Sequence, residues 1–286
     1  MATTIKPDLN SAAPELHGVP LTLEGSSVLH QMFRFRWAEW RKLTDAHRRE
    51  IAAEAAQGLE KMEHEVEGQS ALFSLLAKGD LLLLHFRNSF DQLKQADLQL
   101  ARLKLSDYLE LTTSYLSVVE LGLYESSVKL YRSLREKGIE PHTPEWDAAV
   151  EDTIKRQTEA MRPRLFPQIP ASRYICFYPM DRRRGEDKNW YSLPIEERQR
   201  QMEEHGLVGR RYAATVKQII TGSIGFDDWE WGVDLFADDP LVFKKLIYEM
   251  RFDEVSAVYA LFGKFYVGVR VPAGKLQELL SGNLPQ

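Results

Sequence analysis

The chain has 286 residues and a net charge of −5, with 44% apolar and 28% charged residues. This composition is typical of a globular protein with room for two domains. The acidic balance argues against the basic field of a nucleic-acid-binding protein. No apolar run approaches the ~20 residues that span a bilayer. We therefore expect no nucleic-acid partner and no membrane insertion.

The single cysteine excludes an internal disulfide and a cysteine-rich zinc site. The first 25 residues contain three prolines and no apolar block like that of a secretory signal peptide. We interpret residues 1–26 as an extended tail and expect a cytoplasmic protein.

Residues 27–124 have the pattern of one ferredoxin-like unit, β-α-β-β-α-β. The predicted elements are a strand at 27–37, a helix at 44–66, strands at 71–77 and 81–86, a helix capped by Ser89, and a strand at 114–121. Residues 125–163 are highly charged. They predict one or two surface helices that connect this unit to the next, with no chemistry of their own.

The same order returns in residues 164–286. The predicted elements are strands at 174–180, 216–220, 229–236 and 264–271, a helix at 194–205, and a helix that begins near Asp239-Pro240. The repeat indicates a duplicated unit. We therefore predict an α+β fold in which two ferredoxin-like units in one chain form a dimeric α+β barrel.

His205 ends the predicted helix in the sequence Glu203-Glu204-His205-Gly206. Histidine in a last turn suits the helix dipole, and glycine is common just after a helix, so a capping role is the simpler interpretation. The alternative is an axial ligand of haem iron. One of the two adjacent carboxylates would then accept a hydrogen bond from the other ring nitrogen.

The strand at 174–180 places Tyr174, Cys176, Tyr178 and Met180 on one face. We expect the first two to fill a core. Tyr178 and Met180 lie at the strand's end, where the mouth of a pocket is expected. A phenol there can act as a hydrogen-bond donor or a one-electron redox group.

The run Arg182-Arg183-Arg184 is typical of a solvated loop, and its functional interpretation is a site for carboxylates or phosphates. Arg164 is a second candidate for such a site. Gln218 shares the apolar face of its strand, so it either completes a core hydrogen-bond network or points into a ligand cavity. Trp229 and Trp231 share a strand face and are expected in the core.

Several segments, in this order and spacing, resemble the chlorite dismutase superfamily, and more closely its coproheme decarboxylase branch. They are RYICFYPMDRRR, NWYSLP, EEHGLVGRRYA, VKQIITGSIGFDDWEWGV and YEMRFDEVSA. The resemblance is dense from Arg164 to Val271 and looser over 27–121. It implies two ferredoxin-like units per subunit, a homopentamer, and porphyrin bound only in the C-terminal unit.

The resemblance also implies roles for seven residues. His205 matches the proximal iron ligand, and Tyr178 matches the tyrosine whose radical attacks the propionates. The positions that line the porphyrin and hold its propionates are matched by Arg164, Met180, Arg182, Gln218 and Ser256. Many relatives have lysine in place of Arg182, so the charge is kept while the donor geometry changes.

Gln218 separates two activities within the resemblance. Chlorite dismutases carry arginine at this distal position, and a neutral amide cannot replace its charge near the iron. The implied enzyme is therefore a hydrogen-peroxide-dependent oxidoreductase of haem (porphyrin) biosynthesis. It would convert two propionates of iron coproporphyrin III (coproheme) to vinyls, giving haem b. Coproheme would be both substrate and redox centre, supplied by a coproporphyrin ferrochelatase.

The alternative is a peroxidase-like haem-binding protein or weak chlorite dismutase without decarboxylase activity.

Overall fold

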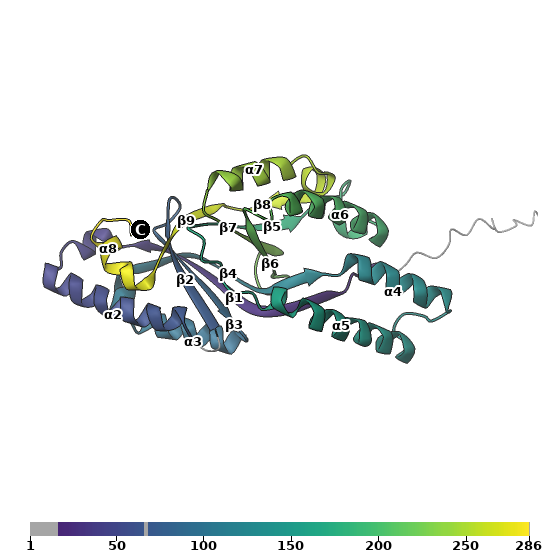
Figure 1. Cartoon of the computed structure of the whole chain (residues 1–286), viewed down its shortest axis with the longest axis horizontal. Coiled ribbons are helices and arrows are strands. Elements are labelled where there is room, and N and C mark those ends of the chain that lie inside the picture. Colours follow the sequence, from purple (N-terminus) through teal and green to yellow (C-terminus); the bar gives the residue numbers. More distant parts are fainter. Residues whose placement is uncertain (1–16, 66–67, 286) are drawn as a thin grey trace, which may run out of the picture.

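The computed structural model describes residues 17–65 and 68–285 and contains the predicted order twice (Figure 1). The first unit comprises β1 (Thr22–Phe35), α2 (Asp45–Glu63), β2 (Gly68–Leu75), β3 (Leu81–Arg87), α3 (Phe90–Ala101) and β4 (Leu109–Gly122). The second comprises β5 (Tyr174–Arg182), α6 (Ile195–Arg211), β6 (Lys217–Gly222), β7 (Trp231–Ala237), α7 (Leu241–Met250) and β9 (Tyr266–Val271). Three short elements were not predicted: α1 (Trp37–Trp40), β8 (Ala260–Phe262) and α8 (Leu276–Leu280).

The strands form one closed barrel. Their order is β7-β6-β4-β1-β3-β2-β9-β5-β8, and β5 also pairs with β7, which closes the ring. The two units meet through the antiparallel pairs β2–β9 and β4–β6, which occupy equivalent places in the two halves. The predicted α+β barrel of two ferredoxin-like units is confirmed.

Local capping explains where the helices of the first unit begin. The Ser89 hydroxyl accepts a hydrogen bond from the Gln92 amide at 3.2 Å, as predicted, and Thr44 caps α2 in the same way through the His47 amide. The predicted helix at 44–66 ends at Glu63, and Val66 lies outside the described residues. Most of the expected tail also lies outside them, and β1 begins at Thr22.

The inside of the barrel is an apolar core that contains a buried hydrogen-bonded pair of side chains, His30 and Asp234. Nε2 of His30 on β1 lies 2.9 Å from Oδ1 of Asp234 on β7, and both side chains are fully buried. The His30 ring stacks on Phe177 with ring centroids 3.9 Å apart. This pair joins the two units across the barrel, and removing one partner would leave the other buried and unpaired.

Residues 125–163 are more than a surface connection. They form most of α4 (Tyr124–Glu136) and α5 (Pro144–Leu165), which share an apolar cluster with Ile195 at the start of α6. The expected boundary at 163/164 lies inside α5. Gly25 allows the end of this helix to approach β1, since a Cβ there would lie 2.0 Å from the Leu165 carbonyl oxygen.

Helix α6 is longer than predicted, which changes the interpretation of His205. The helix continues six residues beyond His205 to Arg211. His205 is therefore not in the last turn, and Gly206 is not a C′ residue. The capping interpretation of this histidine was wrong. Among the described helices, none is both long and apolar enough to cross a membrane.

We expect Asp234→Ala to lower the free energy of unfolding by about 1–3 kcal/mol, because it leaves the buried Nε2 of His30 without its hydrogen-bond partner. The matched control is Asp152→Ala. Asp152 pairs with Arg156 on the surface, where the two side chains are 65% and 68% exposed, so a loss of about 0–1 kcal/mol is expected. Urea unfolding measures both, and equal losses would contradict a special role of the interior pair.

Candidate functional site

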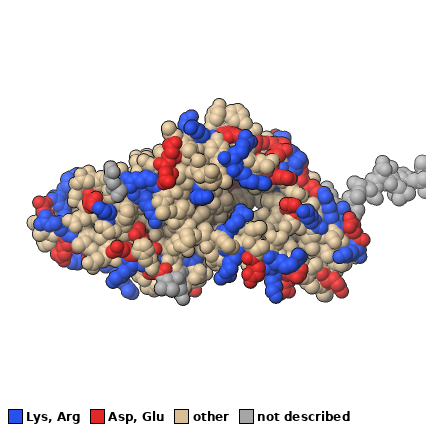
Figure 2. All heavy atoms as spheres, in the orientation of Figure 1, with Lys and Arg blue, Asp and Glu red and all other residues tan. Residues whose placement is uncertain are grey.

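A cavity of about 1840 Å³ lies between α6 and the outward face of β5, β6 and β7. Figure 2 shows this side of the molecule hollowed, with Lys and Arg side chains near the opening. The lining includes all seven residues singled out from the sequence: Arg164, Tyr178, Met180, Arg182, His205, Gln218 and Ser256. Residues that are up to 92 positions apart in the chain thus line the same cavity.

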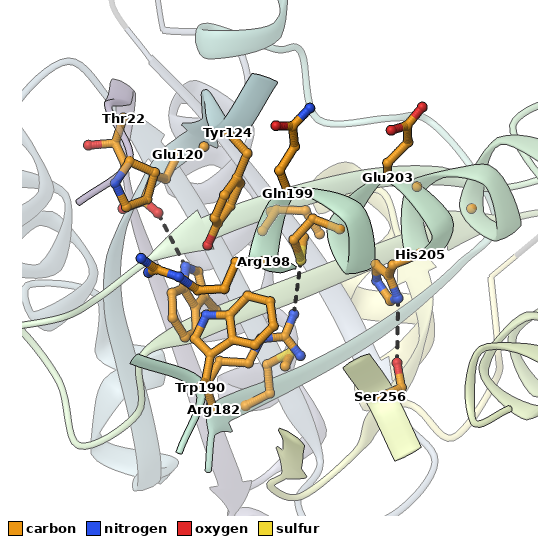
Figure 3. Close-up of a pocket in the computed structure, with 18 of the residues that line it drawn as sticks. Thr22, Glu120, Tyr124, Arg182, Trp190, Arg198, Gln199, Glu203, His205 and Ser256 are labelled. Atoms are coloured by element: carbon orange, nitrogen blue, oxygen red, sulfur yellow. Dashed lines mark hydrogen bonds between the residues drawn. The ribbon is translucent and has the colours of Figure 1, made fainter. Parts of the chain in front are cut away.

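Hydrogen-bond partners at the Nδ1 atom of His205 fix the orientation of its ring. Its Nδ1 lies 2.9 Å from Oδ2 of Asp253, and the Ser256 hydroxyl lies 3.4 Å from the same nitrogen (Figure 3). Asp253 also accepts from the Ser256 amide at 2.8 Å. Since a carboxylate accepts, Nδ1 carries the proton. Nε2 is then the nitrogen with a free lone pair for a ligand in the cavity that His205 lines.

The carboxylate beside His205 is not one of those expected from the sequence. Glu204 pairs with Arg200 at 2.8 Å, and no hydrogen bond joins Glu203 to His205 among the described residues. Asp253, which follows α7, takes this role instead. Burial alone would raise the pKa of Asp253, but hydrogen bonds from His205 and the Ser256 amide lower it below its ordinary value. The carboxylate therefore stays charged and orients the imidazole.

Tyr178 presents a protonated phenol to the cavity. Burial raises its pKa well above the ordinary value, and its ring stacks on Phe265 with centroids 4.5 Å apart. No described residue forms a hydrogen bond with its hydroxyl, so this group remains available to a ligand. Met180 lies beside it on the same face of β5 and also lines the cavity.

Tyr174 and Cys176, on the same face of β5, belong to the core under α6 and α7, as predicted. Burial raises the pKa of the Cys176 thiol to about 12, so it is not a nucleophile near neutral pH.

Arg182 is the last residue of strand β5 and is buried, so it is not part of a solvated loop. Its neighbours Arg183 and Arg184 are exposed. The Arg182 guanidinium carbon lies 5.1 Å from the centroid of the Trp190 ring. Nη1 is buried with no hydrogen-bond partner in the described chain. Because an unpaired buried charge is costly, this position favours an anionic ligand.

Arg164 and Gln218 reach the cavity from different elements. Arg164 is exposed in the last turn of α5. Gln218 is half-buried on β6 and faces Gly209 of α6, where a Cβ would lie 3.5 Å from the Gln218 Nε2, an ordinary packing distance. Two alternatives were open for Gln218, a core hydrogen-bond network or a ligand cavity. In the structure Gln218 lines the cavity.

Several wall residues were not predicted from the sequence. Glu120 on β4 belongs to the first unit, yet it lines the cavity and accepts a hydrogen bond from the Trp231 indole at 3.2 Å. Gly222 makes room for it, because a Cβ there would lie 2.1 Å from the Glu120 Oε2. Trp231, expected in the core, lines the cavity, whereas Trp229 packs against the barrel interior.

Three further lining residues missed by the sequence analysis are Tyr124, Trp190 and Arg198. Tyr124 begins α4, and Glu125 and Arg135 of the same helix also line the cavity, so residues expected to be a connection without chemistry form part of the wall.

This set of side chains fits an iron porphyrin with carboxylate substituents. A haem-type iron site needs one free imidazole nitrogen from the protein, and the ring is fixed by a hydrogen bond from the protonated second nitrogen. Arginines at the cavity wall suit carboxylates. The apolar wall of the second unit offers a surface for a macrocycle through Met180, Ile220, Val233, Ile247 and Phe262.

Comparison with known proteins agrees with this geometry. The sequence profile of the family named chlorite dismutase matches residues 48–271. The chain belongs to the chlorite dismutase family. It is 42% identical to a coproheme decarboxylase from Staphylococcus saprophyticus over 92% of this chain and 98% of that protein.

Two solved structures have the same fold. A heme-binding protein from Thermus thermophilus superposes with a TM-score of 0.77 at 39% identity, over 94% of this chain and all of the other. A chlorite dismutase variant from Candidatus Nitrospira defluvii superposes with a TM-score of 0.67 at 17% identity, over 90% of this chain and 96% of the other. At that identity the second comparison shows the fold alone.

We expect Asp253→Asn to weaken the binding of ferric haem by about 10- to 100-fold, because His205 loses the charged acceptor that orients its ring. Absorbance titration of the purified protein measures the dissociation constant. Glu203→Gln is the control, since Glu203 lines the same cavity but has no hydrogen bond to His205 in the described chain. Equal losses in the two variants would rule out this role for Asp253.

The raised pKa of Glu120 predicts that the stability of the protein depends on pH. Burial raises its pKa above the ordinary 4.5, the Trp231 hydrogen bond opposes that rise, and Glu24 adds to it. Its contribution to stability is thus fully present below about pH 4.5 and is lost as the pH rises through the folded-state value. Glu120→Gln should lose less stability than the wild type between about pH 4.5 and 8. Parallel urea-unfolding profiles would contradict this.

Proposed function

We propose that this protein is a coproheme decarboxylase, which converts two propionates of iron coproporphyrin III to vinyls and releases haem b. Hydrogen peroxide is the oxidant. The proposal is supported by 42% identity to a coproheme decarboxylase over 92% of the chain. The structural observation that carries it is that Tyr178, His205 and the unpaired Arg182 face one cavity.

The reaction is balanced by one peroxide and one proton for each propionate. The side chain R–CH₂–CH₂–COO⁻ gives R–CH=CH₂ and carbon dioxide, and loses two electrons and one proton. Hydrogen peroxide takes up these two electrons and two protons to give two water molecules. The iron of the bound substrate supplies the oxidising chemistry. The protein therefore has to bind the substrate, orient its propionates and pass the oxidation on to them.

His205 and Asp253 provide the iron-side wall. The hydrogen bond from Nδ1 to Asp253 holds the ring in one orientation and leaves Nε2 free, so His205 would be the residue that binds the substrate iron. The resemblance assigns Ser256 to the propionates. Its contacts with Asp253 and His205 support a second contribution, the positioning of the imidazole.

Tyr178 is the catalytic residue of this proposal. Because its pKa is raised, the phenol keeps its hydrogen near neutral pH and can lose a proton and an electron together. The oxidised tyrosine then takes a hydrogen atom from the β-carbon of the nearby propionate. A further one-electron oxidation and loss of carbon dioxide leave the vinyl group. Two rounds complete the conversion.

The carboxylates are held by Arg164, Arg182 and the Gln218 amide, through charge-assisted and neutral hydrogen bonds. Met180 contributes to the apolar wall. Since Gln218 is neutral, it cannot replace the distal arginine expected of a chlorite dismutase, and chlorite turnover should be poor. We further propose that the protein acts in the cytoplasm as a homo-oligomer, a pentamer by the family pattern, downstream of a ferrochelatase.

Tyr178→Phe should abolish vinyl formation from coproheme and peroxide while leaving coproheme binding within about threefold of the wild type, because only the hydroxyl is removed. Mass analysis of the porphyrin after reaction gives the product, and absorbance titration gives the affinity. The matched control is Tyr174→Phe on the same strand face, which does not line the cavity. It should decarboxylate like the wild type. Undiminished product from Tyr178→Phe would remove Tyr178 from the mechanism.

A further inference from the structure

The end of the cavity formed by Trp190 and Tyr124, here called the Trp190 end, contains two buried arginines. Arg182 reaches it from β5 and Arg198 from α6 (Figure 3). Only 8% of Arg182 and 5% of Arg198 is exposed, yet both line the cavity. Arg198 was not among the residues that the sequence pattern or the family resemblance singled out.

Both guanidinium groups lack a full set of partners. Nη1 of Arg182 and Nε of Arg198 are buried without a hydrogen-bond partner in the described chain. Arg198 donates one bond from Nη2 to the Gly18 carbonyl. Glu230 accepts from the backbone amide of Arg182 at 2.8 Å, and among the described residues no carboxylate pairs with either guanidinium. Two buried cations without a counterion are destabilising unless a ligand provides the negative charge.

The two charges act on the same region of the cavity. Burial raises the pKa of the Tyr124 hydroxyl, and the positive charges of Arg198 and Arg182 both oppose that rise. Both guanidinium groups are therefore within electrostatic reach of one hydroxyl. Figure 3 shows Arg182, Arg198 and the Trp190 ring, against which Arg182 packs, at the same end of the cavity.

The position of Arg198 relative to the iron ligand suits a peripheral substituent of a porphyrin. Arg198 precedes His205 by seven residues, which is about two helical turns, so both side chains leave nearly the same face of α6 about 10 Å apart. Tyr178 is four residues from Arg182 on β5, or about 13 Å. A carboxylate at the Trp190 end is therefore a different one from the carboxylate that reacts at Tyr178.

We propose that Arg198 is a substrate-positioning residue. Together with Arg182 it binds one carboxylate of the porphyrin at the Trp190 end, and this contact sets which other propionate faces Tyr178. The inference rests on the proposed function for the identity of the ligand. It adds a second arginine on the opposite wall, so that one carboxylate is held between the helix and the sheet.

The test is a double-mutant cycle on coproheme binding. Arg182→Gln and Arg198→Gln should each raise the dissociation constant about tenfold or more, the usual size for a charged hydrogen-bond partner. The double variant should bind within about threefold of the weaker single variant, because both arginines hold the same carboxylate. Arg198→Lys keeps the charge and should recover part of the loss. All affinities come from absorbance titration without peroxide.

Arg200→Gln is the matched control, because Arg200 lies on α6, is 45% exposed and pairs with glutamates outside the cavity. It should bind coproheme like the wild type, and thermal unfolding of the ligand-free variants checks that each is folded. Wild-type affinity of Arg198→Gln would overturn the inference. So would losses that multiply in the double variant, no recovery with lysine, or an equal loss in Arg200→Gln.

This test is independent of the proposed activity. If the wild type makes no vinyl product but the cycle behaves as expected, the decarboxylase proposal fails and the arginine pair stands. If the wild type decarboxylates coproheme while Arg198→Gln binds it normally, only the role of Arg198 fails.

Discussion

Closure of the barrel is the constraint on which the rest of the structure depends. Each ferredoxin-like unit leaves two edge strands with unpaired backbone groups, and the pairs β2–β9 and β4–β6 satisfy all four edges by joining the units to each other. The pairing of β4 with β6 also brings Glu120 of the first unit to Gly222 and Trp231 of the second. For this reason the cavity of the second unit has a wall from the first, although the two units fold the same chain order.

The cavity exists because α6 is held away from the sheet of its own unit. Its start packs against α4 and α5 through Ile195, and its middle is joined to the segment after α7 by the bond between His205 and Asp253. The helices at 125–163 thus help to hold one wall of the site in place.

The buried positive charges in this cavity favour the binding of an anionic ligand. Arg182 and Arg198 are buried with unsatisfied nitrogens, a cost that the folded protein carries when no anion is bound. Apolar side chains from the sheet face the same space, so a ligand that is flat, apolar at its centre and acidic at its edge satisfies both demands. An iron porphyrin with propionates has these properties, and in the proposed function His205 would bind its iron.

The sequence predicted the order of the strands and helices that build the two ferredoxin-like units, since apolar periodicity and caps such as Ser89 act locally. It also determined which strand face carries Tyr178 and Met180, because side chains alternate along a strand. With the family's motifs, seven cavity residues were identified before their positions were known. Only the tertiary structure decided that His205 is oriented by Asp253, 48 residues later, rather than by the adjacent glutamates. It likewise decided that Arg182 is buried, and that Glu120, Tyr124 and Arg198 complete the cavity. These outcomes depend on strand pairing and helix placement between distant segments, which no local pattern encodes.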